Sequence, residues 1–199
     1  MDKTPKIHPF YGGPFSQWAA CAFTIDGIEY SCAEKYMMAA KASLFGDDEA
    51  LAAIMESDSP REQKAWGRKV KGFNPDVWNA VAKDVVFRAN MAKFTQNRDM
   101  WKYMVLTGND ILVEASPTDR VWGVGISEDD PRIYNQDEWQ GTNWLGEVLM
   151  EVREAIRFWW CTFVTDMKIV QAALNSTDGC GCKNEACFCE MASKGEVQV

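Results

Sequence analysis

The sequence predicts a mostly helical α+β fold, a single domain with a small β-sheet or hairpin and a long C-terminal helix. Three observations lead to this prediction. Helix-capping residues precede apolar side chains at helical spacing several times between residues 31 and 106. Short runs with strand character and turn residues beside them occur at 23–30 and 111–115. Finally, apolar side chains repeat at helical spacing from Leu145 to about Leu174.

The chain divides into three parts. Its 199 residues suit one domain with a sizeable core, and we see neither an internal repeat nor an interdomain linker. We place that domain at residues 10–175, between an N-terminal tail at 1–9 and a Cys-rich C-terminal tail at 176–199. The one histidine of the chain, His8, falls in the N-terminal tail.

The first elements of the domain are a hairpin and a helix. Asp26-Gly27 supplies the positive φ angles of a type I′ turn, so residues 23–30 are expected to form a β-hairpin. A helix is expected from about Ser31. Ser31 and Glu34 match a capping box, in which the serine caps the helix and the glutamate reaches back to the serine.

Capping and helix-breaking residues define the remaining elements. Helices are expected at 47–56, from Ser59-Pro60 to about Val70, from Asn74-Pro75 to about Lys93, and from 97 to 106, before Gly108. A short strand is expected at 111–115, and an ordered loop at 116–141. Asn143 is expected to cap the final helix. A loop as long as 116–141 within one domain is more often functional than idle.

The net charge and the hydropathy of the chain limit the kinds of molecule that it is expected to bind. The formal net charge of −8 and the absence of a basic run disfavour a protein that grips duplex DNA through many phosphates. A nucleotide or a single modified base remains open as a ligand. No segment approaches the roughly 20 apolar residues of a membrane span, and the N-terminus lacks a signal-peptide core. We therefore expect a soluble intracellular protein in the cytoplasm, with no membrane partner.

Several kinds of active site are excluded by what the chain lacks. With His8 as the only histidine, neither a Ser-His-Asp triad nor a histidine metal site is available. Gly123-Val124-Gly125 is too short for a dinucleotide fingerprint, and no phosphate-binding loop of the Walker type is present. Carboxylate and amine chemistry remains.

Glu34 and Lys41 are the strongest candidates for that chemistry. They lie seven residues apart in the first predicted helix, so both point from the same face. Met37, Met38 and Phe45 share this face, and ionised side chains are costly in such apolar surroundings. An active site, a structural ion pair and a capping role for Glu34 all remain open.

The chemistry of the pair depends on its surroundings. Burial would lower the pKa of Lys41 and favour a nucleophilic amine, whereas a nearby carboxylate would raise it. A neutral lysine amine can attack a carbonyl-like carbon and form a Schiff base, and a carboxylate can carry the protons. Glu114 and Asp119 supply further acids near the strand at 111–115, although Asp119 also suits a turn.

Five groups of short motifs follow one another along residues 10–157. They are Phe15-Ser16-Gln17-Trp18; Asp26-Gly27 with Ala33-Glu34-Lys35-Tyr36 and Ala40-Lys41; Ser59-Pro60, Gly67-Arg68, Trp78 and Lys93-Phe94; Leu112-Val113-Glu114, Asp119 and Trp122-Gly123-Val124-Gly125; and Gly141-Thr142-Asn143-Trp144-Leu145-Gly146 with Leu149-Met150-Glu151-Val152-Arg153. In these motifs and their order, the chain resembles the NADAR family, also called the YbiA-like family. The chain has Gln17 where the family has Asn, and Lys35 where it has His.

The resemblance implies an N-glycosidase that needs no cofactor for catalysis. Members are associated with removal of ADP-ribose from modified guanine in nucleic acid, or with hydrolysis of ribosylamino-pyrimidines of the riboflavin pathway. A non-catalytic module that binds ADP-ribose or NAD is the alternative class. If the chain removes ADP-ribose from guanine, its expected partner is a substrate that contains ADP-ribose, in single-stranded or modified nucleic acid.

The resemblance also assigns roles to residues. Lys41 is expected to be the nucleophile, Glu34 the proton carrier, and Asp119 a third catalytic group. The expected substrate-binding residues are Phe15, Ser16, Gln17, Trp18, Tyr36, Arg68, Trp122, Gly123, Gly125, Asn143, Gly146 and Arg153. Trp18 and Trp122 would stack on a base, and Asn143 would help to hold a phosphate at a helix N-terminus.

A separate cluster of cysteines lies beyond the region of resemblance. Cys180, Cys182, Cys187 and Cys189 could form a structural zinc site, because four thiolates suit tetrahedral zinc. One residue separates the members of each pair, whereas zinc pairs more often have two or more. Free or redox-active thiols and disulfides therefore remain open, the disulfides being disfavoured inside a cell.

Overall fold

The structure is a computed structural model that describes residues 5–174, with side chains as far as Trp159. Two compact units divide the chain, Met1–Val152 and Arg153–Val199, and each is described by itself. The predicted fold class is confirmed: helices dominate, with two small two-stranded sheets and a long last helix. That helix, α6 (Trp144–Leu174), begins in the first unit and continues in the second.

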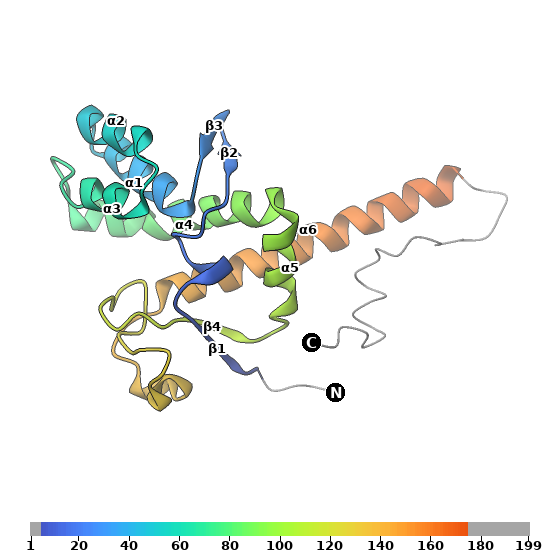
Figure 1. The fold of residues 1–199 in the computed structure, drawn as a ribbon. Helices are drawn as coiled ribbons and strands as arrows, with labels where there is room; N and C mark the ends of the chain where they lie inside the picture. The colour runs from blue at the N-terminus through green and yellow to red at the C-terminus, as the bar shows by residue number, and fades with distance from the viewer. Residues whose placement is uncertain (1–4, 175–199) are drawn as a thin grey trace. The chain divides into compact units, whose positions relative to one another are not determined.

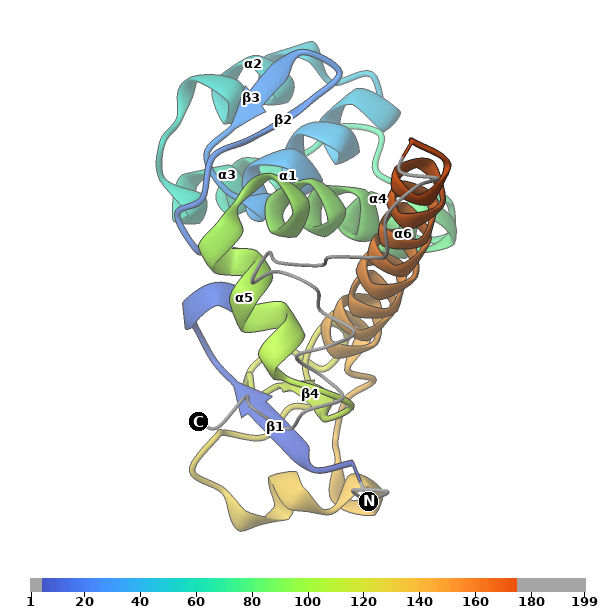
Figure 2. The ribbon, with the colours of Figure 1, turned by 90° about the vertical axis from the view of Figure 1, so that its right-hand side faces the viewer.

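Four helices pack together in the first unit (Figures 1 and 2). They are α1 (Ala33–Leu44), α2 (Asp48–Glu56), α3 (Pro60–Gly67) and α4 (Pro75–Gln96), and α1 packs against the other three. Side chains of Asp47, Ser59 and Asn74 accept hydrogen bonds from backbone N–H groups at the starts of α2, α3 and α4. The predicted starts of these helices are confirmed, while α3 ends earlier than Val70.

The predicted capping box at the start of α1 is wrong. Cys32 rather than Ser31 precedes the helix, and its side chain makes no capping hydrogen bond. Glu34 does not reach back to a serine. Its backbone N–H instead donates to the carbonyl oxygen of Gln17 at 2.9 Å, so a distant segment satisfies the helix start. The Glu34 carboxyl is therefore not used for capping.

The two sheets have different origins. Strands β2 (Phe23–Ile25) and β3 (Ile28–Tyr30) form the predicted antiparallel hairpin, with φ of 52° at Asp26 and 79° at Gly27. Strand β1 (Ile7–Phe10) pairs in parallel with β4 (Ile111–Glu114), which corrects the predicted tail at residues 1–9. His8 lies in that pairing, opposite Leu112.

The rest of the first unit includes the helix that follows α4, strand β4 and the loop after this strand. Helix α5 (Arg98–Leu106) follows α4, and the predicted loop at 116–141 contains two short 3-10 helices, η2 (Pro131–Tyr134) and η3 (Gln136–Glu138). Loop and strand share a small core made of Val113, Ala115, Val124, Ile126 and Ile133. This core fixes the loop, which occupies the lower left of Figure 1.

A buried clamp holds the segment that follows the first 3-10 helix, η1 (Gly13–Phe15). Lys93, fully buried in α4, donates from its amine to the carbonyl oxygen of Ser16 at 2.8 Å. One turn earlier in α4, Asn90 accepts a hydrogen bond of 3.4 Å from the Gln17 side-chain amide. With the bond from Glu34 N–H to Gln17, residues 16–18 are tied to both α4 and α1.

The clamp predicts an unusual pH dependence of stability. Burial lowers the pKa of Lys93 to about 8, opposed by Cys21 and Cys32, whereas an unfolded lysine titrates near ~10.4. Between these values the unfolded chain binds more protons, so the unfolding free energy rises with pH. Relative to Lys93→Met, the native protein should gain about 2 kcal/mol between about pH 7 and about pH 9.5.

Urea unfolding at a series of pH values measures this difference, because titrations common to both proteins cancel. Lys102→Met serves as the matched control, since Lys102 is an exposed lysine of α5 paired with Asp99. Its profile should parallel that of the native protein. If the unfolding free energy of Lys93→Met had the same pH dependence as that of the native protein, the pKa of Lys93 would not be lowered in the folded state.

Candidate active site

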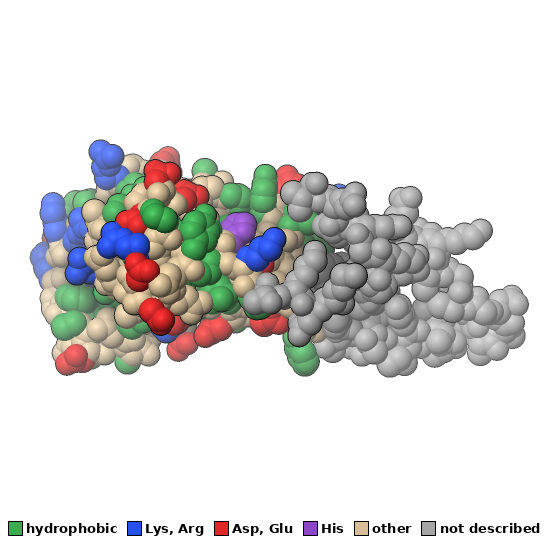
Figure 3. Space-filling model, turned by 90° about the horizontal axis from the view of Figure 1, so that it is seen from below, with side chains coloured by type: hydrophobic (Ala, Val, Ile, Leu, Met, Phe, Trp, Pro, Cys, Tyr) green, Lys and Arg blue, Asp and Glu red, His purple; other side chains and the backbone are tan. Residues whose placement is uncertain are grey.

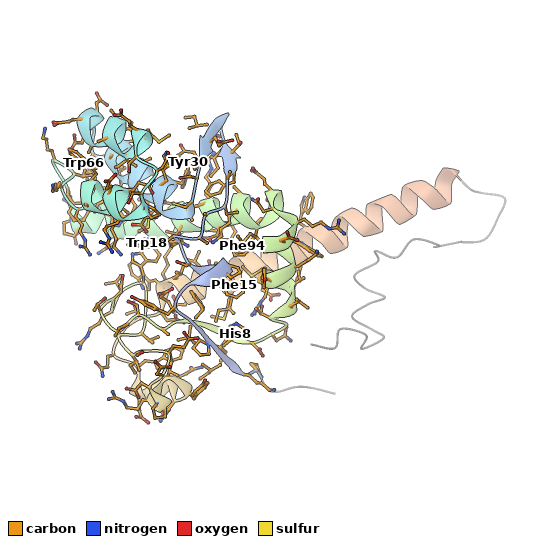
Figure 4. All side chains as sticks on the ribbon, in the orientation of Figure 1. His8, Phe15, Trp18, Tyr30, Trp66 and Phe94 are labelled. Carbon is orange, nitrogen blue, oxygen red and sulfur yellow. The ribbon has the colours of Figure 1, made fainter. Side chains whose placement is uncertain are left out.

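A cleft of about 930 Å³ opens between the α1–α3 helices and the loop after β4. One wall consists of α1 and α3, the second of residues 114–122, and the third of residues 11–19. Figure 4 shows the labelled Trp18 between the helices above it and the loop below it. The volume suits a nucleotide-sized ligand.

Glu34 and Lys41 both line this cleft, as their spacing on one helix predicts. Glu34 is only 4% exposed and receives a hydrogen bond from the side chain of Trp18. The Lys41 amine lies 4.0 Å from the centre of the Phe73 ring and 5.7 Å from that of Trp78. An acid and an amine thus share apolar and aromatic surroundings.

These surroundings shift both groups toward neutral pH. Burial raises the pKa of the Glu34 carboxyl, and Asp119 adds to this, while Lys64, Trp18 and Arg68 act in the opposite direction. For Lys41 the sign that the sequence left open is now resolved. Burial lowers its pKa and Arg68 lowers it further, outweighing the charge of Glu34. The uncharged amine is therefore more accessible than in an exposed lysine.

Two further carboxyls occupy the opposite wall. Burial raises the pKa of Glu114 to about 7, with Asp119 adding to the shift and Lys64 opposing it. Asp119 also lines the cleft, but one of its oxygens accepts hydrogen bonds from the N–H groups of Val121 (2.9 Å) and Trp122 (2.8 Å). The alternative role foreseen for Asp119, a turn residue, is thus present in the structure together with its place in the cleft.

Three basic side chains line the cleft from the same side of α3 and its C-terminal end. Arg61, Lys64 and Arg68 are spaced three and four residues apart and all line the cleft. Among the described residues none of the three forms an ion pair. In contrast, Lys71 pairs with Glu49 outside the cleft. On the face seen from below, Figure 3 shows both basic and acidic side chains, with several of the basic ones toward the left edge.

The structure brings eight of the expected site residues together. The cleft is lined by Ser16, Gln17, Trp18, Glu34, Lys41, Arg68, Asp119 and Trp122. Their roles stay predictions, because no ligand is present. Phe15 and Tyr36 lie outside the lining: Phe15 packs on His8, Phe10 and Phe94, and Tyr36 contacts Tyr30 and Arg88 on the side of the hairpin.

Four more expected binding residues support the backbone instead. Asn143 is buried, and its amide joins it to β4, accepting from the Glu114 N–H (3.0 Å) and donating to the Leu112 carbonyl (2.9 Å). The N–H groups of Asn143, Trp144 and Leu145 donate to loop carbonyls, so they are not available to a phosphate. Asn143 thus supports the backbone around β4, and its contact with a substrate stays a prediction.

Gly123, Gly125 and Gly146 allow close packing. A side chain at Gly146 would overlap the Leu112 carbonyl, so the start of α6 lies directly against β4. A side chain at Gly123 would meet the Glu114 and Asp119 carbonyls at 2.9 and 3.0 Å. Gly125 has a φ of 68°. These residues shape the loop and lie outside the cleft lining of the described chain.

The remaining predictions fall elsewhere. Arg153 opens the second unit, so its contact with a substrate stays a prediction. Cys180, Cys182, Cys187 and Cys189 lie outside the described residues. Within residues 5–174, the side chains that are described form no cluster of three potential metal ligands. No helix in the same part of the chain is long and apolar enough to cross a membrane.

Some cleft residues were missed or undervalued from the sequence. Arg61 and Lys64 share a helical face with Arg68, and this spacing alone could have identified them. Tyr11, Ser116 and Thr118 come from irregular segments, whose side-chain directions follow no period. Trp78 was noted only as a family motif, and the structure places its ring beside the Lys41 amine.

The two departures from the family motifs differ in their consequences. Lys35 is buried outside the cleft lining, with its amine 3.9 Å from Asp58. The missing histidine therefore does not change the cleft wall of this chain. Gln17, in contrast, lines the cleft, and its buried side-chain oxygen Oε1 has no hydrogen-bond partner among the described residues.

Comparisons with known proteins agree with this geometry. The model of the NADAR domain matches residues 8–157. The chain is 43% identical over 145 residues to "N-glycosidase R617" of Acanthamoeba polyphaga mimivirus, covering 70% of this chain and 85% of the viral protein. It is 30% identical over 144 residues to "N-glycosidase YbiA" of Escherichia coli (strain K12), covering 72% and 81%.

A solved structure extends the likeness to the fold. The NMR structure of the E. coli protein YbiA superposes with a TM-score of 0.65 and 28% sequence identity. The match covers 78% of this chain and 88% of that one. The resemblance noted in the sequence motifs is thus confirmed at the level of family and fold.

The electrostatics of the cleft predict opposite effects of two substitutions on the pKa of Lys41. Glu34→Gln removes a charge that raises this pKa, so the pKa should fall further. Arg68→Gln removes a charge that lowers it, so the pKa should rise. NMR titration of reductively ¹³C-methylated lysines measures both shifts, with Lys102 as an internal control. Shifts of the same sign in the two variants would contradict this arrangement of charges.

Proposed function

Because the chain belongs to the NADAR family, we propose that it is an N-glycosidase that removes ADP-ribose from ADP-ribosylated guanine in nucleic acid. One observation carries the proposal most directly: Lys41, with a lowered pKa, and the buried acid Glu34 line the same cleft. This combination suits attack on the carbon that joins a ribose to a nitrogen. Two relatives, R617 and YbiA, are named N-glycosidases, which supports the same reaction class.

The reaction starts from the uncharged Lys41 amine. Its nitrogen attacks the anomeric carbon of the ribose, and the bond from this carbon to the ring oxygen breaks, with a proton from the attacking nitrogen passing to that oxygen. The bond from the same carbon to the guanine nitrogen then breaks. The departing nitrogen gains a proton, and a lysine–ribose imine remains. Water then adds to the imine carbon, which releases ADP-ribose and restores the amine. Glu34, buried beside the lysine, carries protons during these steps.

The cleft has suitable partners for the rest of the substrate. Arg61, Lys64 and Arg68 present positive charge for the diphosphate, without competing ion pairs among the described residues. The rings of Trp18 and Trp122 border the same space, and aromatic rings stack well on bases. Trp122 is held in place by an edge contact with Trp144, with ring centres 5.6 Å apart.

The acidic net charge favours a second candidate, a small ribosylamino-pyrimidine. A charge of −8 repels a long polyanion, and Lys41, Arg61, Lys64 and Arg68 offset it locally inside the cleft. Both candidates carry a ribose on an exocyclic amine and use the same lysine. Parallel hydrolysis assays with ADP-ribosylated single-stranded DNA and with the free ribosylamine decide between them. We expect the larger kcat/KM on the DNA, and the reverse order would assign the small metabolite.

Lys41→Ala should abolish turnover while leaving the fold intact, because Lys41 is half-buried at the edge of the cleft. We expect a loss of at least about 10³-fold in kcat, as for removal of a nucleophile. Borohydride added during turnover should link ribose covalently to the native protein and not to Lys41→Ala. Lys102→Met, a variant far from the lining, should keep both activity and adduct.

The adduct is identified by mass spectrometry of the peptide that contains residue 41. Full activity in Lys41→Ala would refute the imine mechanism. Tight binding of ADP-ribose by calorimetry, with no hydrolysis of either substrate, would instead indicate the binding-module alternative.

A further inference from the structure

The cleft holds three carboxyls, and they are not equivalent. Glu34 shares the α1 wall with Lys41 and receives a hydrogen bond from Trp18. An oxygen of Asp119 accepts two backbone hydrogen bonds that close the turn before Trp122. Glu114 lines the cleft as well, and no hydrogen bond from a described residue contributes to the pKa of its carboxyl. Its carboxyl is thus the least committed of the three.

The backbone of Glu114 is nevertheless held firmly. Its N–H donates to the Asn143 side chain at 3.0 Å, and its carbonyl accepts from the Val124 N–H at 3.0 Å. Strand β4 ends at this residue, in a core shared with the loop. A fixed main chain with an uncommitted side chain is the arrangement expected of a group that acts on a ligand.

We propose that Glu114 is the acid that protonates the departing guanine nitrogen, while Glu34 serves Lys41 on the opposite wall. The inference rests on the proposed N-glycosidase function and deepens it by dividing the proton transfers between two carboxyls. Residues of β4 and of α1 line the same cleft from different sides. A ribose held between them has the lysine on one side and the Glu114 carboxyl on the other.

The step balances without any further reactant. As the bond between the anomeric carbon and nitrogen breaks, its electron pair stays on the nitrogen, which takes the proton of the Glu114 carboxyl. The resulting carboxylate accepts a proton from the water that adds to the imine carbon. One water is consumed, ADP-ribose and the guanine amine are released, and Glu114 ends protonated as it began.

The electrostatics of the wall support this role. Burial, with the charge of Asp119, raises the pKa of Glu114 to about 7, so a large fraction carries a proton at neutral pH. Lys64 of α3 opposes the shift. The other charged groups that face the cleft are Glu34 and Lys41 from α1, Arg61 from α3, and Arg68, which directly follows α3. A general acid works best with a pKa near the working pH.

The test compares leaving groups in Glu114→Gln, which keeps the size of the side chain and removes the proton. On ADP-ribosylated guanine, kcat should fall about 10²- to 10⁴-fold, the range of general acid catalysis. On an ADP-ribosyl p-nitroanilide, whose nitrogen departs more readily, the loss should be much smaller. The decline of kcat above neutral pH should also disappear in the variant on the guanine substrate.

Two controls separate this role from a structural one. Glu114→Asp keeps an acid and should retain the decline at high pH with a partial loss of rate, which provides the test if Glu114→Gln does not fold. Asp119→Asn keeps the oxygen that accepts the two backbone hydrogen bonds but removes a charge that raises the pKa of Glu114, so it should retain the decline of kcat and move it to lower pH.

The outcomes distinguish the two proposals. Equal losses of Glu114→Gln on both leaving groups, or an unchanged pH profile, would overturn the role of Glu114 while leaving the lysine adduct in place. Failure of the native protein to form that adduct or to hydrolyse either substrate would overturn the proposed function itself. An intact adduct with a loss confined to the guanine substrate supports both.

Discussion

The hydrogen bond from the buried Lys93 amine to the Ser16 carbonyl is the constraint on which the cleft depends. It fixes residues 16–18 against α4, and the N–H of Glu34 completes the attachment by donating to Gln17. Trp18 is thereby placed so that its side chain reaches the Glu34 carboxyl. Burying a lysine amine away from water costs free energy of folding, but here the amine helps to hold together three segments that are distant in sequence. The cost in stability and the position of the acid are therefore linked.

Burial in the cleft is also the largest cause of the pKa shifts of both Glu34 and Lys41. Loss of water raises the pKa of Glu34 and lowers that of Lys41, which moves both toward neutrality. The charge of Glu34 opposes the shift at Lys41, and the charge of Lys64 opposes the shift at Glu34, yet burial prevails at each group. Arg68 lowers the pKa of both groups, so it adds to the shift of Lys41 and opposes that of Glu34. An acid and a base that can exchange protons near neutral pH follow from position rather than from unusual residues.

The sequence predicted what local geometry controls and not what depends on distant contacts. One helix carries Glu34 and Lys41, so their spacing sufficed to place both on one face. Tyr36 belongs to the same motif, but it lies two residues from Glu34 and consequently faces the hairpin. The capping box failed because the helix start is satisfied by Gln17, 17 residues earlier in the chain. The pairing of β1 with β4 joins segments about a hundred residues apart, and no local pattern reports it.

The motif residues consequently divide into two kinds, those that border the cleft and those that hold them. Asn143 lies outside the cleft lining of the described chain, yet its side chain fixes the backbone of Glu114. Gly146 lets α6 approach β4 closely enough for that bond to form. The same distinction explains the departures of this chain from the family motifs. Lys35 is directed to Asp58, whereas Gln17 borders the cleft with a side-chain oxygen, Oε1, that has no described partner. Differences in substrate choice from other family members are thus expected to originate at Gln17, because only there does the altered side chain belong to the cleft wall.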